Sequence, residues 1–400
     1  MHLPRNKGEN YSSQKCEYLT FAKHHKSVKA NCGIFEAGPM FRKLPSLVLA
    51  VSLVAACGGN PFDARIADDE PTTPPTTDPG PVGSGSLPGT TNPTPSSAIT
   101  RFEARGEGNN QGNGFANNFN YDADTDTFVV SGLAFDGVQP GGARYTRATG
   151  TGGTPIALGS GFAAYEGPAV VPDSVTGDLI AQLPHRAVLG TGTNTELAIV
   201  RTGAYAGYGF GGFVYRRNGG VVLPSTGQAI YSGNYAGLRD YNGVGGIDYA
   251  TGRMEMAIDF NGFANNCTGA RCADAVRGEI FDRRVFDVDG NDITASLVTA
   301  INSEQNASLT GLPVLRLRIG PGVMDANGEI RGEVNSDFAN NEGRVVAYEQ
   351  GNYYAIMSGN HTTGGEIVGI LVVEATNDRA PGSTLRETGG FILQRGASSP

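Results

Sequence analysis

The stretch Arg253-Met254-Glu255-Met256-Ala257-Ile258-Asp259-Phe260 decides the fold. Its even-numbered positions are all large and apolar, and its odd-numbered positions are charged or small. Because successive side chains of a β-strand point to opposite faces, this alternation predicts a strand with one buried face and one face in water.

Similar short runs, bounded by Gly, Asn and Asp, fill the chain from Gln228 onward. The expected strands are Ala229–Ala236, Val244–Tyr249, Arg253–Phe260, Val276–Asp282, Val314–Ile319, Glu329–Val334, Glu366–Glu374 and Glu387–Gln394. We expect the turn Ala250-Thr251-Gly252 to link the second and third strands, a further strand around Val345–Tyr348, and a short helix between Thr294 and Leu309.

Eight antiparallel strands without an evident covering helix predict a closed barrel, because closure removes exposed strand edges. A barrel of this size is just wide enough to be filled by its own side chains, so recognition is expected in loops. The longest loop candidates are Ala264–Ala275, Asp282–Leu312 and, further upstream, Gly137–Gly161.

The region from Arg101 to Leu223 also looks β-rich, with shorter strands and longer loops. Residues 120–130 read as two strands around an acidic turn, in which Asp122, Asp124 and Asp126 alternate as in a calcium loop. Thr127 and Leu133 stand where an EF-hand needs Gly and Glu, so we interpret this segment as a turn. The stretch 287–292 resembles a calcium loop in the same way and is also interpreted as a turn. Gly accounts for 59 of the 400 residues, and short alternating runs bounded by Gly, Asn and Asp recur after residue 100, so we predict an all-β fold.

A different signal lies near the start of the chain, where Val54-Ala55-Ala56-Cys57 reads as a lipobox. Arg42 and Lys43 precede an apolar run that is too short to span a bilayer, so residues 40–56 are predicted to be a lipoprotein signal peptide. Cleavage would make Cys57 the lipidated first residue and anchor the protein to a membrane. A buried core helix ending in Cys is the alternative, but the Pro/Thr-rich segment that follows argues against it.

That segment, residues 57–99, contains nine of the 22 prolines between positions 58 and 99, and is predicted to be a disordered tether. Upstream, residues 1–39 would place a signal peptide forty residues into the chain. All six lysines precede Cys57. We therefore interpret residues 1–39 as an over-extended gene start, with a real cytoplasmic extension as the alternative.

The charge of the mature chain limits its partners. Residues 1–56 hold eight basic and three acidic residues, and the remaining 22 basic and 36 acidic residues give a net charge of −14. Nucleic-acid binding needs a positive surface, so we expect no nucleic-acid partner. The same negative charge argues against a polybasic surface that binds the membrane. We therefore expect the lipid to anchor the protein.

Four side chains remain as candidate sites after Cys57. Cys267 and Cys272 lie in a polar loop and are predicted to form a disulfide, since the protein is exported and a zinc site would need two further ligands. We expect binding at this loop and at the neighbouring segment Asp282–Asp292. His185 and His361 are expected in solvated loops, with a haem or metal role as the alternative. No nucleophile elbow is present, and we predict no catalytic residues, no cofactor and no enzyme activity.

Several motifs resemble the transferrin-binding protein B family. They are LPSTGQAIYSG at Leu223–Gly233, GIDY followed by TG at Gly246–Gly252, GNYYA at Gly351–Ala355, EIVG at Glu366–Gly369 and GGFILQR at Gly389–Arg395. Ala355 and Val368 depart from the family's glycines. The resemblance covers about 170 residues and implies one lobe, with a β-rich handle over 100–223 followed by an eight-stranded barrel over 224–397. We also expect the barrel to stand as an independent unit from about Gln228 to Arg395.

The resemblance also implies a place and a role. It suggests an outer-membrane lipoprotein at the cell surface that binds a protein or small solute for nutrient acquisition of the iron or haem type. The implied partners are a TonB-dependent receptor and a surface-lipoprotein export barrel. The alternative is a structural or adhesion-type surface lipoprotein without a solute ligand.

Overall fold

The computed structural model describes residues 87–104, 116–133, 143–172, 176, 178–181, 185–203, 211–260, 276–318, 323–377, 380 and 382–396. The chain divides into two compact units, 1–54 and 55–400, and all described residues belong to the second. Among them, no helix has both the length and the apolar character needed to cross a bilayer.

The first part of this unit forms an antiparallel sheet of eight strands, which we call the handle sheet. Its strand order is β1-β10-β9-β8-β5-β4-β3-β2. The strands are β1 (Ile99–Phe102), β2 (Asn118–Asp122), β3 (Thr127–Ser131), β4 (Ala143–Arg147), β5 (Phe162–Glu166), β8 (Arg186–Thr191), β9 (Thr195–Arg201) and β10 (Gly211–Arg217). A short 3-10 turn, η2 (Thr151–Gly153), follows β4, and β6 (Val170–Pro172) with β7 (Leu179–Ala181) makes a separate two-stranded ribbon.

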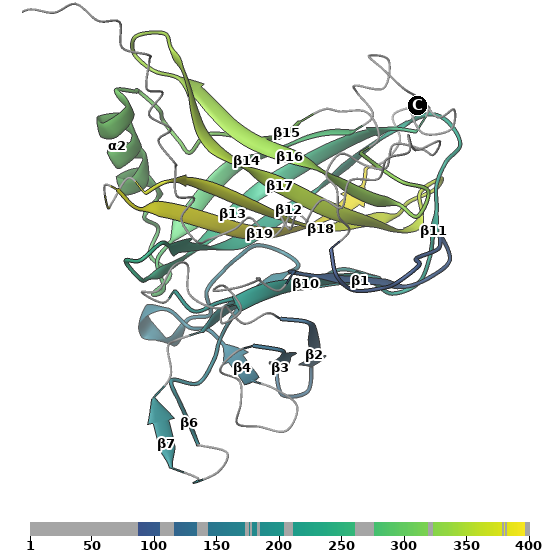
Figure 1. Cartoon of the computed structure of the whole chain (residues 1–400), viewed down its shortest axis with the longest axis horizontal. Helices are drawn as coiled ribbons and strands as arrows, with labels where there is room; N and C mark the ends of the chain where they lie inside the picture. The colour runs from purple at the N-terminus through teal and green to yellow at the C-terminus, as the bar shows by residue number, and fades with distance from the viewer. Residues whose placement is uncertain are drawn as a thin grey trace, which may run out of the picture. The chain divides into compact units, whose positions relative to one another are not determined.

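The second part is a closed barrel of eight strands, each antiparallel to both of its neighbours (Figure 1). The strands pair in chain order, and β12 also pairs with β19, so the sheet has no open edge. They are β12 (Gln228–Tyr241), β13 (Ile247–Asp259), β14 (Val276–Phe286), β15 (Leu315–Leu317), β16 (Glu329–Ala339), β17 (Val345–Asn360), β18 (Glu366–Thr376) and β19 (Thr384–Arg395). A two-residue strand, β11 (Val221–Val222), runs parallel to the end of β17 and leads into the barrel.

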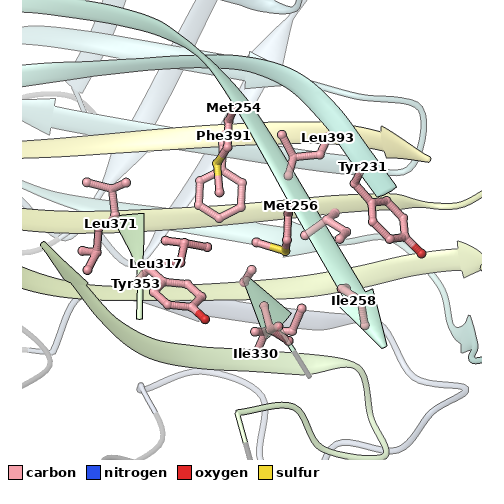
Figure 2. Close-up of a cluster of buried hydrophobic side chains, with 14 of the residues drawn as sticks. Tyr231, Met254, Met256, Ile258, Leu317, Ile330, Tyr353, Leu371, Phe391 and Leu393 are labelled. Carbon is pink, nitrogen blue, oxygen red and sulfur yellow. The ribbon is translucent and has the colours of Figure 1, made fainter. Parts of the chain in front are cut away.

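The barrel interior is packed with apolar side chains. Figure 2 shows that they come from strands all around the barrel, among them Met254 and Met256 of β13, Tyr353 of β17 and Phe391 of β19. Close packing leaves no room for extra atoms, as at Gly389, where an added Cβ would lie 2.0 Å from the Tyr235 hydroxyl. The prediction that the barrel is filled by its own side chains is confirmed.

The handle sheet packs against the outer wall of this barrel. One hydrophobic cluster joins Leu197, Ile199 and Phe213 of the handle sheet to outward side chains of β12, β17, β18 and β19, such as Ile356 and Ile370. These barrel strands are therefore apolar on both faces, and β18 is buried along almost its whole length. The motifs in β17, β18 and β19 lie in this shared wall.

The other face of the handle sheet has its own core. It contains Phe128, Tyr145, Tyr165 and Val214 together with neighbouring aliphatic residues. The sheet curls so strongly that the guanidinium of Arg216 on β10 stacks 4.3 Å over the ring of Phe119 on β2, although these strands are far apart in the sheet order.

One end of the barrel is covered by the helix α2 (Thr294–Gln305). Ile301 of this helix is buried in a cluster with Tyr241, Phe338, Tyr348 and Leu385 from four barrel strands. The predicted helix is confirmed, and its position over the end of the barrel was not evident from the sequence.

The number of barrel strands is as predicted, although two boundaries were misplaced. Residues 250–252 do not form a turn, because β13 runs through them and absorbs the irregularity as a register shift opposite β14. The expected strands at Val244–Tyr249 and Arg253–Phe260 are thus one strand. The eighth strand is β17, which extends the short run at Val345–Tyr348 through Gly351 to Asn360.

Candidate functional site

Charged side chains also lie inside the barrel, near the end that α2 covers. Arg239, Arg283, Glu349 and Glu387 form what we call the core ion cluster. They lie in phase with inward-facing apolar residues of their own strands and are almost completely buried. The cluster holds two positive and two negative groups, so its formal charges balance.

Arg283 lies at the centre of the core ion cluster. It donates to both carboxylate oxygens of Glu349 at 2.7 Å and to Glu387 at 3.0 Å. Arg239 lies 3.2 Å from Glu387, and the Tyr235 hydroxyl donates to the same carboxylate at 2.6 Å. Burial would raise the pKa of Glu349, but the charge and hydrogen bonds of Arg283 hold this pKa below its usual value. The cluster is a buried network of ion pairs and hydrogen bonds that joins four strands.

A concavity large enough for a ligand lies on the outside of the barrel, over β16, β17 and β18. We call it the wall groove. Its volume is about 840 Å³. The side chains that give it its chemistry are Arg318, Glu333, Asn335, Gln350, Asn352 and Glu374. Those on β16, β17 and β18 project outward, because they alternate with the buried residues of the same strands, and Arg318 is exposed just after β15.

The strand register explains why these side chains meet. Asn335 of β16 is paired with Gln350 of β17, which is paired in turn with Glu374 of β18. One step along the strands, Glu333 is paired with Asn352. Side chains that are directly opposite in antiparallel strands lie about 5 Å apart, so the register builds a continuous polar strip.

A second, smaller concavity lies on the outer wall over β12 to β15. Its volume is about 390 Å³, and it is bordered by Ile230, Glu255, Ala257 and Arg277. Glu255 directly opposes Glu279 across the strand pair, an arrangement that costs stability in a sheet. The smaller concavity serves below as a matched reference for the wall groove.

The predicted lipidation and disulfide sites, Cys57, Cys267 and Cys272, lie outside the described residues, as does the loop Ala264–Ala275. Lipidation and the disulfide stay predictions. The domain division at residues 223 and 224 also stays a prediction.

The segment Asp282–Asp292 is described, and it is not an open loop. β14 continues to Phe286, and Asp287 closes a tight turn by accepting hydrogen bonds from the amides of Asp289 and Asn291. The tip of this turn is held against the handle, because the Thr151 amide donates to the Asp289 carbonyl at 3.1 Å. Within Gly137–Gly161, the described part contains β4 and η2. The expectation of a free loop at Asp282–Asp292 was wrong because strand pairing with β13 extends further than the residue pattern indicated.

Both histidines are buried, so the expectation of solvated loops was wrong. His185 Nδ1 lies 2.8 Å from the Tyr145 hydroxyl, and His361 Nδ1 lies 2.7 Å from the Tyr231 hydroxyl. Burial lowers the pKa of each histidine to about 4. The backbone of Gly365 packs closely against the His361 ring, and a Cβ added to this glycine would lie 2.6 Å from the ring. Buried, tyrosine-bonded imidazoles of this kind are part of the packing.

The carboxylates of the acidic turn between β2 and β3 accept hydrogen bonds from neighbouring residues of the handle sheet. Asp122 accepts hydrogen bonds from the amides of Asp124 and Thr125. Asp126 is bonded to Arg147 at 2.9 Å and to the Tyr165 hydroxyl at 2.6 Å. These contacts fasten the turn to β4 and β5.

Sequence reasoning missed the core ion cluster and the wall groove. A signal for the cluster was present, because Arg239 follows Tyr231 and Tyr235 at even spacing and Glu387 precedes Phe391 at the same phase. The groove had no comparable signal, since it depends on which strands become neighbours.

No protein-family model and no curated protein sequence matches this chain. Solved structures do match. Two are mutants of the vaccine antigen transferrin-binding protein B from Haemophilus parasuis, a double mutant at 12% identity and TM-score 0.30 and a single mutant at 10% identity and TM-score 0.30. They match over 69% and 76% of this chain and 45% and 52% of theirs. The third is an intact transferrin-binding protein B with its N and C lobes, at 9% identity and TM-score 0.26, over 74% of this chain and 62% of that one. The chain thus spans about half the length of the structures to which it is similar.

Proposed function

We propose that this protein is a lipid-anchored binding protein of the outer membrane, which captures a protein or a small solute outside the cell for nutrient uptake. One observation carries the proposal. The barrel interior is filled with side chains, whereas its outer wall carries an open polar groove of about 840 Å³. The barrel then acts as a rigid scaffold, and a ligand binds to its outer wall.

Two further features support this proposal. The lipobox ending at Cys57 and the Pro/Thr-rich segment after it suit a body held clear of a membrane by a tether. The handle sheet and the barrel share a core and several buried polar contacts, including Arg101 with Glu329 at 2.7 Å. A preorganised body of this kind loses little entropy when a ligand binds.

The experiment tests the lipid anchor, the surface location and the retention of a ligand in turn. Intact mass measurement of the membrane-extracted protein is expected to find diacylated Cys57 as the first residue, and protease added to whole cells is expected to remove the body. Cells expressing the protein are then expected to retain a solute or protein from the growth medium that cells expressing Cys57→Ser do not retain.

Two results would overturn the proposal. An unmodified Cys57 would remove the anchor. A surface-exposed, lipidated protein that retains nothing from the medium would favour the structural or adhesion-type alternative.

A further inference from the structure

The wall groove presents neutral polar groups. The side chain of Gln350 is exposed and makes no hydrogen bond with any other described residue. Thr376 and Thr384, which also line the groove, have exposed side chains at its rim. A side-chain amide offers both donors and an acceptor, and a hydroxyl offers one of each. The groove therefore suits a ligand that donates and accepts hydrogen bonds along its length.

The positive charge in the groove is already compensated. The guanidinium of Arg318 donates to Glu333 at 2.8 Å. Glu374 also has a partner within the protein. An anionic ligand would have to compete with Glu333 for Arg318. Anion-binding sites, by contrast, present arginines that converge on the ligand and are not already paired. A neutral ligand avoids this competition.

Apolar anchors are also missing among the described residues of the groove. Val334, Tyr348 and Ala375 contribute to its floor, but their side chains are buried in the barrel. The large hydrophobic side chains that the described residues expose, including Val222 and Val345, do not line it. A protein interface of high affinity is centred on buried aromatic or aliphatic anchors, so the lining fits a protein partner poorly.

We propose that the wall groove binds an uncharged, hydroxyl-rich ligand, a saccharide. Its volume lies within the range of small-molecule sites, roughly 300–1,000 Å³. The amides of Asn335 and Gln350, which are paired across β16 and β17, supply donors and acceptors, and Thr376 adds a hydroxyl two residues beyond Glu374, the partner of Gln350 on β18. This inference rests on the proposed function and specifies the ligand class for its groove.

The test uses the full mature chain in detergent on an array of neutral, sialylated and sulfated oligosaccharides, with a lysine-rich peptide as a further probe. Binding to at least one neutral oligosaccharide is expected. Gln350→Ala is expected to weaken that binding about tenfold, the effect of losing one or two hydrogen bonds. Gln228→Ala, an exposed glutamine at the start of β12, is the matched control and is expected to bind as the wild type does.

Each contrary result has a definite meaning. If no neutral oligosaccharide binds, or if only a charged glycan or the peptide binds, the ligand class is wrong. If a neutral oligosaccharide binds equally to wild type and Gln350→Ala, and also to a groove-filling Ala347→Trp variant with an unchanged circular dichroism spectrum, the location is wrong. The proposed function survives these failures if cells still retain another solute from the medium, and fails only if they retain none.

Discussion

At the scale of single residues, the core ion cluster shows how a barrel tolerates charges in its interior. Arg283 is bonded to two carboxylates, and its Nη1 also donates to the Pro313 carbonyl at 2.8 Å. Removing one partner from such a network leaves a buried charge without compensation. We expect Glu349→Ala to lower the free energy of unfolding by about 3–5 kcal/mol, measured by urea denaturation.

The control is an ion pair on the surface. Arg318 and Glu333 are bonded at a similar distance, but both side chains are more than half exposed. Replacing Glu333 by Ala should cost less than about 1 kcal/mol. Equal losses in the two variants would show that the interior cluster does not stabilise the fold in the way proposed here.

The two buried histidines predict how stability depends on pH. Burial lowers their pKa to about 4 in the fold, from 6.5 in the unfolded chain. Between these values the unfolded state binds more protons, so stability falls as the pH drops from about 6.5 to 4. Each histidine is expected to contribute on the order of 1–3 kcal/mol over that window.

The measurement is urea denaturation of the mature chain at pH 7, 6, 5 and 4.5. The double variant His185→Gln/His361→Gln should be less stable at pH 7 and show a flatter dependence over this range. Other groups, such as Glu349, contribute equally to the pH dependence of stability in both proteins. The difference between the two slopes therefore reports the histidines alone. An identical slope in both proteins would contradict the assignment.

At the scale of elements, α2 contributes the buried side chain of Ile301 to the apolar cluster at the end of the barrel. Ile301→Ala would leave a cavity among Tyr241, Phe338 and Leu385. We expect a loss of about 2–4 kcal/mol in the free energy of unfolding. Ser303→Ala, on the exposed side of the same helix, should change it by less than about 0.5 kcal/mol. A small effect of Ile301→Ala would mean that the helix only rests on the barrel.

The elements also show what a sequence pattern reveals and what it does not. Alternation predicted the central parts of most barrel strands, because burial on one face is a local property. It failed at Thr251, where a register shift let one strand continue through an apparent turn. It also failed in the second half of β17, which is buried on both faces from Tyr353 to Ser358 by the barrel core and the handle sheet and so has no alternation to read there.

The wall groove could not be predicted from a local sequence pattern. The wall groove depends on the pairing of β16, β17 and β18, which are separated by turns and strand reversals in the sequence. Neither Asn335 nor Gln350 belongs to a recognisable motif, and only the strand register places them side by side. Loop length alone suggested a binding loop at Asp282–Asp292. In the structure this segment is a paired strand end followed by a tight turn.

At the scale of the whole molecule, the handle sheet and the barrel share one hydrophobic core. Val368 and Ile370 of β18 face the handle and are completely buried. We therefore expect the mature chain to unfold in a single calorimetric transition. A fragment covering residues 224–397 should retain a β-type circular dichroism spectrum but bind a hydrophobic dye and unfold at a lower temperature. Two separate transitions, or a fragment as stable as the whole chain, would contradict a shared core.

The central claim is that ligands bind to the outer wall of the barrel at the wall groove. Its most direct test compares two alanine-to-tryptophan variants in cells that express the protein. Ala347 lines the wall groove, and Ala257 lines the smaller concavity on the outer wall over β12 to β15. The measurement is the amount of solute from the growth medium that cells retain, at equal surface levels of protein. We predict that Ala347→Trp abolishes retention and that Ala257→Trp leaves it unchanged. Full retention by Ala347→Trp would contradict it.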